Sequence, residues 1–248
     1  MLPTTKTTRE LDPRKQAVFL YGAPKVGKST FCAGLFGGDV LFLDTEQGTR
    51  NLDRYCVAVA SWWDFIAAVE ALHREEHAYQ CVAVDTVDAL RDLCIRAVCE
   101  KMQIPDISHP KFSSHGRGWG QVNQRFSDGI KLLFSGAWGV VFVGHEKTEE
   151  RTPDGRLITI DENYKGPRVL KAVPSLSNRQ RLMISGLSDI ILRAGIDGDR
   201  RVLTSAPSET VEAGDRSGIL PPAFDMDPET YTEFFRAAMR AEGSKKAH

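Results

Sequence analysis

A glycine-rich loop at residues 22–29 has the residue types and the spacing that bind a phosphate chain. Gly22 and Gly27 bracket the loop, and glycine tolerates positive φ and carries no side chain, so the backbone N–H groups between them can turn towards an anion. Lys28 can reach the β- and γ-phosphate oxygens, and the hydroxyl of Ser29 can ligate Mg²⁺. Glycine, four residues, glycine, lysine and serine form the complete Walker A pattern. We therefore expect this loop to bind a nucleotide.

The loop lies between a predicted strand and a predicted helix, as phosphate binding requires. Residues 17–21 have the β-branched and aromatic content of a short buried strand, and a helix is expected over residues 29–36 before Gly37 and Gly38 end it. The positive end of that helix points at the anion. The expected nucleotide-binding residues are Gly22, Ala23, Pro24, Lys25, Val26, Gly27, Lys28, Ser29 and Thr30.

Three further apolar runs end in polar residues: 40–43 before Asp44 and Glu46, 81–84 before Asp85, and 140–144 before His145. The carboxyl ends of parallel strands meet at one edge of a sheet, so we expect these groups beside the loop. Asp85 is a Walker B candidate that would hold Mg²⁺ together with Ser29. The next residue, Thr86, is not a glutamate, so Glu46 is the group left to orient a water.

The alternation of strands and helices through residue 145 predicts an α/β fold with a mainly parallel central sheet flanked by helices. Residues 152–155, with the sequence TPDG, predict a β-hairpin after the fourth strand. Final strands are expected at 190–193 and 201–203. A C-terminal helix is expected from Asp227, and residues 243–248 are expected to be a frayed tail.

The composition of the 248 residues gives no global electrostatic reason to expect nucleic acid or a membrane, because the net charge is −1. Five cysteines without a CxxC pair indicate reduced thiols in a cytosolic compartment. A zinc site from Cys94, Cys99, His109 and His115 is disfavoured, because residues five apart on a helix point about 140° from each other. With no signal peptide and no apolar run of about 20 residues, we expect a cytoplasmic protein without a membrane partner.

The segment FLDTEQGT, residues 42–49, resembles the part of RecA-like recombinases in which a glutamate activates the attacking water. Residues 144–146 are similar to the place where that family has a residue that senses the γ-phosphate, although His145 stands here instead of the usual glutamine. With the Walker A loop, the order of elements over about 17–205 resembles a RecA-like P-loop NTPase. The resemblance implies ATP and Mg²⁺ as cofactors and the catalytic residues Lys28, Glu46, Asp85 and His145.

Within that family the chain looks most like the compact bacteriophage ATPases of the Sak type, which promote annealing of single-stranded DNA. The short length and residues 217–221, SGILP, fit this resemblance. It implies an ATPase that anneals or recombines single-stranded DNA as a ring or filament, in the host cytoplasm, with a single-strand-binding protein as a further candidate partner. The expected organisation is a flexible N-terminal segment (1–15), a RecA-like ATPase domain (16–220), and a C-terminal helix and tail (221–248).

Two stretches without acidic residues lie where RecA-like proteins contact DNA, before and after the fourth strand. Residues 107–127 contain three arginines or lysines, and residues 164–188 contain five. Clustered basic residues suit contact with backbone phosphates. The expected DNA-contacting residues are Lys111, Arg117, Lys165, Arg168 and Lys171. The same arginines and lysines could instead form a solvated face or reach a neighbouring subunit's ATP, for which Lys171, Arg168 and Arg216 are candidates.

Other classes of nucleotide-binding protein differ in what they require. A GTPase needs an Asn-Lys-x-Asp guanine reader, and residues 144–147, GHEK, do not provide one. A small-molecule kinase stays open, with Arg151, Arg156 and Arg168 as candidate lid residues. A nucleotide-dependent protein-interaction switch, similar to a helicase loader, also stays open and predicts ATP binding without affinity for DNA.

Overall fold

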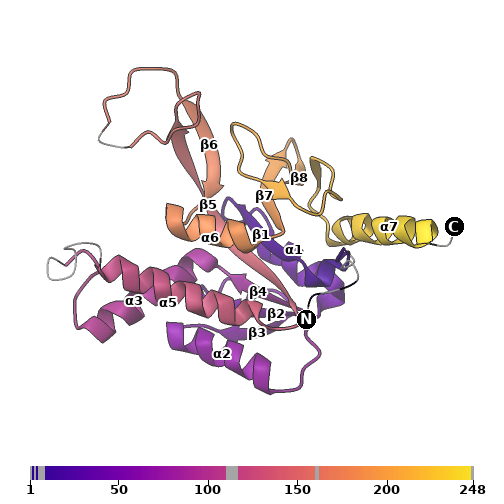
Figure 1. Ribbon diagram of the computed structural model, residues 1–248, viewed down its shortest axis with the longest axis horizontal. Helices are drawn as coiled ribbons and strands as arrows, with labels where there is room; N and C mark the ends of the chain where they lie inside the picture. Colours follow the sequence, from indigo (N-terminus) through magenta and orange to yellow (C-terminus); the bar gives the residue numbers. More distant parts are fainter. Residues whose placement is uncertain (1, 3, 5–8, 110–116, 160–161, 247–248) are drawn as a thin grey trace.

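A mainly parallel sheet runs through the middle of the computed structural model, which describes residues 2, 4, 9–109, 117–159 and 162–246 (Figure 1). Its parallel strands follow the spatial order β7-β1-β5-β4-β2-β3. Their bounds are β1 (Ala17–Gly22), β2 (Val40–Asp44), β3 (Tyr55–Ala58), β4 (Cys81–Asp85), β5 (Gly139–Arg151) and β7 (Ile190–Asp197). The strand that leads into the glycine-rich loop therefore lies between β5 and β7.

Helices cover both faces of this sheet (Figure 1). One face packs against α2 (Trp62–Arg74), α3 (Val87–Met102), α5 (Arg117–Phe134) and α6 (Asn178–Leu187). The other face packs against α1 (Lys28–Gly34) and α7 (Pro228–Lys246). Two short 3₁₀ helices, η1 (Pro13–Lys15) and η2 (Leu35–Gly38), precede β1 and end α1.

The alternation of side chains along each central strand builds the two cores. In β1, Phe19 and Tyr21 lie in the core under α2, α3 and α5, whereas Val18 and Leu20 lie in the core under α1 and α7. Successive side chains of a strand point to opposite faces, so a strand covered on both sides must be apolar throughout. The continuous apolar runs that predicted these strands therefore reflect burial on both faces.

Antiparallel strands complete one edge of the sheet and form an arm beyond it. The edge strands are β8 (Arg200–Thr204), β9 (Gly214–Asp215) and β10 (Ala223–Asp225). Strand β5 continues past the sheet and pairs with β6 (Val169–Pro174), from Glu146 opposite Pro174 to Arg151 opposite Val169. We call this antiparallel pair of β5 and β6 the arm; it projects from the sheet in Figure 1.

The expected α/β fold, with a mainly parallel central sheet flanked by helices, is confirmed, as is an antiparallel pair after the strand at 140–145. The turn at 152–155 is present, with the Gly155 N–H donating to the Thr152 carbonyl at 2.8 Å. Beyond the turn only Leu157 forms a bridge with Arg151, and β6 begins at Val169, so a long connection separates the two strands of the pair.

Two further details differ from the sequence expectation. Strand β3 was not predicted, although its sequence YCVA lies in an apolar run; all four of its residues are exposed at the edge of the sheet. The C-terminal helix continues to Lys246, past Gly243, where a frayed tail was expected. Within the described residues, no helix has the length and apolar character needed to cross a membrane.

Candidate nucleotide-binding site

The glycine-rich loop leaves β1 where the strand lies tightly against β7. A Cβ atom on Gly22 would lie 2.4 Å from the Ala194 carbonyl oxygen, so only glycine fits there. Lys25 and Gly27 have left-handed backbone conformations, with φ of 64° and 106°. Helix α1 then begins at Lys28, which places its N-terminal N–H groups over the loop. Of the two bracketing glycines, Gly27 has the expected positive φ, whereas Gly22 is required by its close approach to β7.

Lys28 is held inside the loop by its own backbone. Its ammonium group is buried and donates to the carbonyl oxygens of Gly22 and Ala23, both at 2.9 Å. Burial lowers the pKa of Lys28, against the opposing effect of the negative charges on Asp85 and Asp88. An ammonium group has three donors, so one remains for a phosphate oxygen.

Asp85 ends β4 beside the hydroxyl of Ser29. Burial raises the pKa of its carboxyl group, while a hydrogen bond with Ser29 acts in the opposite direction. Its Oδ2 atom is buried and has no hydrogen-bond partner among the described residues. Buried polar atoms are normally satisfied, and Mg²⁺ prefers hard oxygen ligands. An orphaned carboxylate oxygen next to a hydroxyl fits Mg²⁺, so the predicted pair of Ser29 and Asp85 could hold this ion.

Glu46 lies on a turn that Asp44 fixes in place. The Asp44 carboxylate accepts from the N–H groups of Glu46 at 3.1 Å, Gly48 at 3.3 Å and Thr49 at 3.2 Å, and from the Thr49 hydroxyl. Burial opposes the ionisation of Asp44, but these hydrogen bonds outweigh it and lower its pKa. Asp44 is thus a structural residue, and the Glu46 side chain is left to face the cavity described below.

A second tie fixes the end of β2 to the end of β4. The Thr45 N–H donates to the Asp85 carbonyl at 2.8 Å, and the Thr45 hydroxyl bonds to the Thr86 carbonyl and N–H at 3.0 and 2.7 Å. These bonds set the spacing between the Glu46 turn and the Walker B strand. The residue after Asp85 therefore positions the neighbouring strand end instead of supplying a base.

His145 is oriented by Asp88, which the sequence did not indicate. The Nδ1 atom of His145 lies 2.6 Å from Oδ2 of Asp88, and the His145 N–H donates to Oδ1 at 3.1 Å. An ionised carboxylate only accepts, so Nδ1 carries the proton and Nε2 faces Glu46, at 3.9 Å from its Oε2 atom. Ligand atoms of Glu46, Asp88 and His145 lie within 4.8 Å of one another, so the three could also hold a cation.

One cavity of about 480 Å³ joins these groups, a volume within the size range of ligand pockets. It is lined by six loop residues and by residues at the ends of β2, β4 and β5, namely Pro24, Lys25, Gly27, Lys28, Ser29, Thr30, Glu46, Gly48, Asn51, Leu52, Asp85, Thr86 and His145. All four predicted catalytic residues line it. Of the predicted loop residues, Gly22, Ala23 and Val26 do not, and the Val26 side chain packs into the core.

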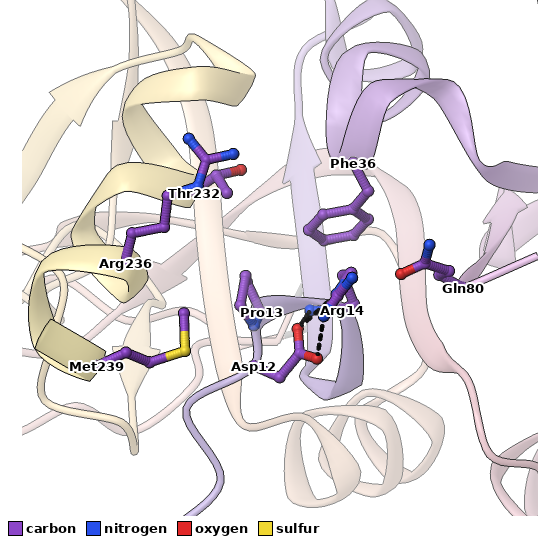
Figure 2. Close-up of a pocket in the computed structure, with 8 residues that line it drawn as sticks. All are labelled: Asp12, Pro13, Arg14, Phe36, Gln80, Thr232, Arg236 and Met239. Carbon is purple, nitrogen blue, oxygen red and sulfur yellow. Dashed lines mark hydrogen bonds and ion pairs between the residues drawn. The ribbon is translucent and has the colours of Figure 1, made fainter. Parts of the chain in front are cut away.

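A second cavity, of about 290 Å³, lies at the opposite edge of the sheet (Figure 2). It is formed near the start of β1 and β4, between η1, η2 and α7, by Asp12, Pro13, Arg14, Phe36, Gln80, Thr232, Arg236 and Met239. The Arg14 guanidinium pairs with Asp12 at 2.8 Å. No predicted site residue lines this cavity, because the polar strand ends are at the other edge.

The predicted DNA-contacting residues divide into two groups. Lys111 lies outside the described residues, and Arg117 begins α5. Lys165, Arg168 and Lys171 lie in β6 of the arm or just before it. Lys165 and Arg168 are exposed, but Arg168 pairs with Glu150 of β5 and donates to the Tyr164 carbonyl at 2.8 Å.

The charge count over residues 164–188 overstates the basic surface of the arm. Arg181 is buried and pairs with Glu149 at 2.8 Å. Glu149 and Glu150 come from β5, and antiparallel pairing with β6 brings them alongside the basic stretch. A count along one segment cannot include acids that pairing supplies from another.

The candidate lid residues of a kinase are all paired. Arg151 pairs with Glu149 at 2.7 Å, Arg156 with Glu162 at 2.7 Å, and Arg168 with Glu150. A lid that clamps a phosphoryl group needs cations that are free to move onto it. This pairing disfavours the kinase interpretation.

The cysteines of the disfavoured zinc site are free thiols in α3. Cys94 and Cys99 are both buried, and burial raises the pKa of Cys94 to about 12. A thiolate is the form that binds metal, so Cys94 is poorly suited to zinc. His115 lies outside the described residues.

A family profile agrees with a nucleotide site. The profile of a family described as an AAA domain matches residues 14–217. No curated protein matches the chain. Among solved structures, the crystal structure of the RadB recombinase is similar, with a TM-score of 0.44 and 14% sequence identity over 77% of this chain and 80% of that chain. The family profile spans most of the sequence and includes the loop, Glu46, Asp85 and His145. The chain therefore belongs to the AAA domain family and is a nucleotide-hydrolysing P-loop ATPase.

Proposed function

We propose that this ATPase is RecA-like, binds single-stranded DNA and promotes its annealing or recombination, in the manner of the phage Sak-type proteins. The observation that carries the proposal is the course of β5. This strand delivers His145 to the nucleotide cavity and continues without a break into the arm, where it pairs with β6. The nucleotide site and the basic stretch of residues 164–188 are thus joined by one rigid element.

The proposed roles follow from the positions of the side chains. Lys28 binds the phosphate chain with its remaining donor, and Ser29 and Asp85 hold Mg²⁺. When bound, Mg²⁺ neutralises charge on the β- and γ-phosphates. Glu46 orients the attacking water and accepts its proton. With the Nδ1–H of His145 held by Asp88, Nε2 would contact the γ-phosphate as a donor, in the ring that carries a proton on both nitrogens. Loss of the γ-phosphate would release His145 and so alter the conformation of β5 where the arm begins, at Glu146.

The proposed DNA contacts lie on the arm and before α5. Lys165 and Lys171 form no hydrogen bond or ion pair among the described residues, so both are available to phosphates. At the root of the arm, Arg193 of β7 pairs with Glu146 at 2.6 Å. That ion pair fixes the arm to the strand next to β1, which would relay the state of the nucleotide site.

The proposal is tested by ATP turnover with and without single-stranded DNA across a salt series, with Lys28→Ala as the blank. Phosphate contacts release counterions, so stimulation by DNA should fade as salt rises. The variant Lys165→Ala/Lys171→Ala should weaken DNA binding and flatten the salt dependence. The matched control is Lys101→Ala/Lys131→Ala, which removes two exposed lysines from α3 and α5.

The annealing part of the proposal needs a separate measurement. Complementary oligonucleotides that carry a fluorophore and a quencher should pair faster with the protein than without it, and the lysine variant of the arm should lose this effect. Turnover that is indifferent to DNA, together with no salt-dependent DNA binding, would overturn the proposal and leave the nucleotide site standing alone.

A second function, the nucleotide-dependent protein-interaction switch, is favoured by the open edge at β3. Strand β3 pairs with β2 on one side, and no strand of the described chain pairs with its other side. Tyr55 and Val57 on this strand are exposed. Unpaired strand edges readily accept another strand. This function predicts ATP-dependent binding of a protein partner and no affinity for DNA.

A further inference from the structure

An arginine from the antiparallel edge of the sheet lies against the phosphate-binding loop. The Cδ, Nη1 and Nε atoms of Arg201 in β8 are 3.5, 3.6 and 3.7 Å from the point where a Cβ on Gly27 would lie. Arg201 is exposed, and its backbone is fixed on both sides of β8. It lies opposite Ile196 of β7, and its carbonyl accepts from the Met226 N–H at 2.9 Å.

The Arg201 guanidinium has no partner in the described part of the chain, where neither a hydrogen bond nor an ion pair engages it. The arginines nearest to it are paired. Arg200, on the same strand, lies 3.3 Å from Asp225, and Arg193 on β7 is paired with Glu146. A guanidinium carries five N–H donors in a fixed plane that suits phosphate oxygens and aromatic rings. Arg201 thus presents an unengaged guanidinium beside the loop, next to the cavity and outside its lining.

The order of the strands shows which part of a nucleotide Arg201 would meet. Glu46, Asp85 and His145 come from β2, β4 and β5, which all lie on one side of β1. Strands β7 and β8 lie on the other side (Figure 1). A nucleotide bound across the loop, with its terminal phosphate towards Glu46 and His145, has its nucleoside end towards β8.

We propose that Arg201 is a nucleotide-binding residue that contacts the part of the ligand shared by ATP and ADP, on the nucleoside side of the phosphate chain. The inference rests on the proposed nucleotide site and adds a contact from β8 to it. No sequence motif includes Arg201, which is far from the Walker A loop along the chain. Only the pairing of β8 with β7 brings it to the loop.

The test is the affinity of Arg201→Ala for fluorescent ATP and ADP, with Arg200→Ala as the matched control. Loss of a charge-assisted contact should weaken both nucleotides by about tenfold or more, to a similar extent. Turnover at saturating ATP should stay near that of the unchanged protein, so the effect falls on KM. Arg201→Lys should recover part of the affinity, because it keeps the charge but loses the planar fork.

Three results would overturn the inference: unchanged affinity of Arg201→Ala, the same loss in Arg200→Ala, or a loss for ATP with none for ADP. The last would place Arg201 at the γ-phosphate. Thermal unfolding without nucleotide checks that the variants fold alike. The inference and the proposed function fail differently, since a failed nucleotide site would abolish binding in the unchanged protein.

Discussion

At the scale of single residues, Gly22 must be a glycine. It joins the P-loop to β1, and the backbone of β7 leaves no room for a side chain. In Gly22→Ala the new Cβ would lie 2.4 Å from the Ala194 carbonyl oxygen, so one of the two strands must move. We expect a loss of about 1–3 kcal/mol in the free energy of unfolding and a marked loss of ATP affinity. Urea unfolding and nucleotide titration measure the two effects.

The control for this substitution is Gly186→Ala in α6. No atom lies within 4 Å of a Cβ at Gly186, and alanine favours helix over glycine by up to about 1 kcal/mol. This variant should be as stable as the unchanged protein or more so. Equal effects of the two substitutions would show that close packing at Gly22 is not the cause.

Asp88 is predicted to act through His145 as a positioning residue. Asp88→Asn keeps the size of the side chain but removes the negative charge that favours a ring protonated on both nitrogens, so Nε2 is a poorer donor to the γ-phosphate. We expect nearly unchanged ATP affinity and turnover lower by about 10- to 100-fold, which a phosphate-release assay measures. Asp92→Asn, on the same helix and paired with Arg91, should leave turnover unchanged. Equal turnover of the unchanged protein and Asp88→Asn would remove Asp88 from the site.

The cavity residues that follow apolar runs could be predicted from the sequence, whereas those that no such run marks were missed. Glu46, Asp85 and His145 follow apolar runs, so the edge where they meet could be predicted. Asp88 stands in the first turn of a helix, where an acidic residue is ordinary. Arg201 is an exposed arginine, and only the pairing of distant strands distinguishes it from the others.

At the scale of elements, a buried cluster helps to hold the arm to the domain. Glu149 of β5 is buried and accepts from Arg181 of α6 at 2.8 Å and from Arg151 at 2.7 Å. Burial opposes the ionisation of Glu149, but the hydrogen bonds and charges of the arginines outweigh it and lower its pKa. The cluster therefore stabilises the fold while Glu149 is ionised.

Glu149→Gln should lower the free energy of unfolding by about 1–3 kcal/mol at neutral pH, because Arg181 then keeps only its longer ion pair with Glu212, at 3.5 Å. The pKa of Glu149 is lower in the folded state, so this contribution is complete above the unfolded pKa of about 4.5 and is lost as the pH falls through the folded value. Urea unfolding of both proteins between pH 3 and pH 7 measures the difference.

The matched control is Glu150→Gln, which removes an exposed partner of Arg168 and should cost at most about 1 kcal/mol. A difference between Glu149→Gln and the unchanged protein that stays constant down to pH 3 would contradict the assignment.

The arm could be predicted only in part, because the outer half of β5 is polar and the partner acids lie on a different strand. Edge strand β3 was missed although its four residues are apolar, because the strand is short and shows no alternation of apolar and polar residues.

At the scale of the whole molecule, hydrophobic cores pack against both faces of one sheet. The ends of four strands of this sheet meet at one cavity. The apolar runs predicted that the central strands are buried on both faces, and the alternation with helices predicted that they are mainly parallel. The order of the strands could not be predicted, because each strand is equally apolar and would fit several neighbours. That order decides which groups face the terminal phosphate and which face the nucleoside end.

We expect the cavity at the carboxyl ends of the parallel strands to hydrolyse ATP, with Glu46 as the group that orients the attacking water. The most direct test is the rate of ATP hydrolysis by Glu46→Gln at saturating ATP and Mg²⁺, with the affinity for ATP measured on the same samples. Glutamine keeps the length of the side chain but cannot accept the proton of the water. We predict unchanged affinity within about threefold and a rate lower by about 10²- to 10⁴-fold. Hydrolysis at the rate of the unchanged protein would contradict this account of the site.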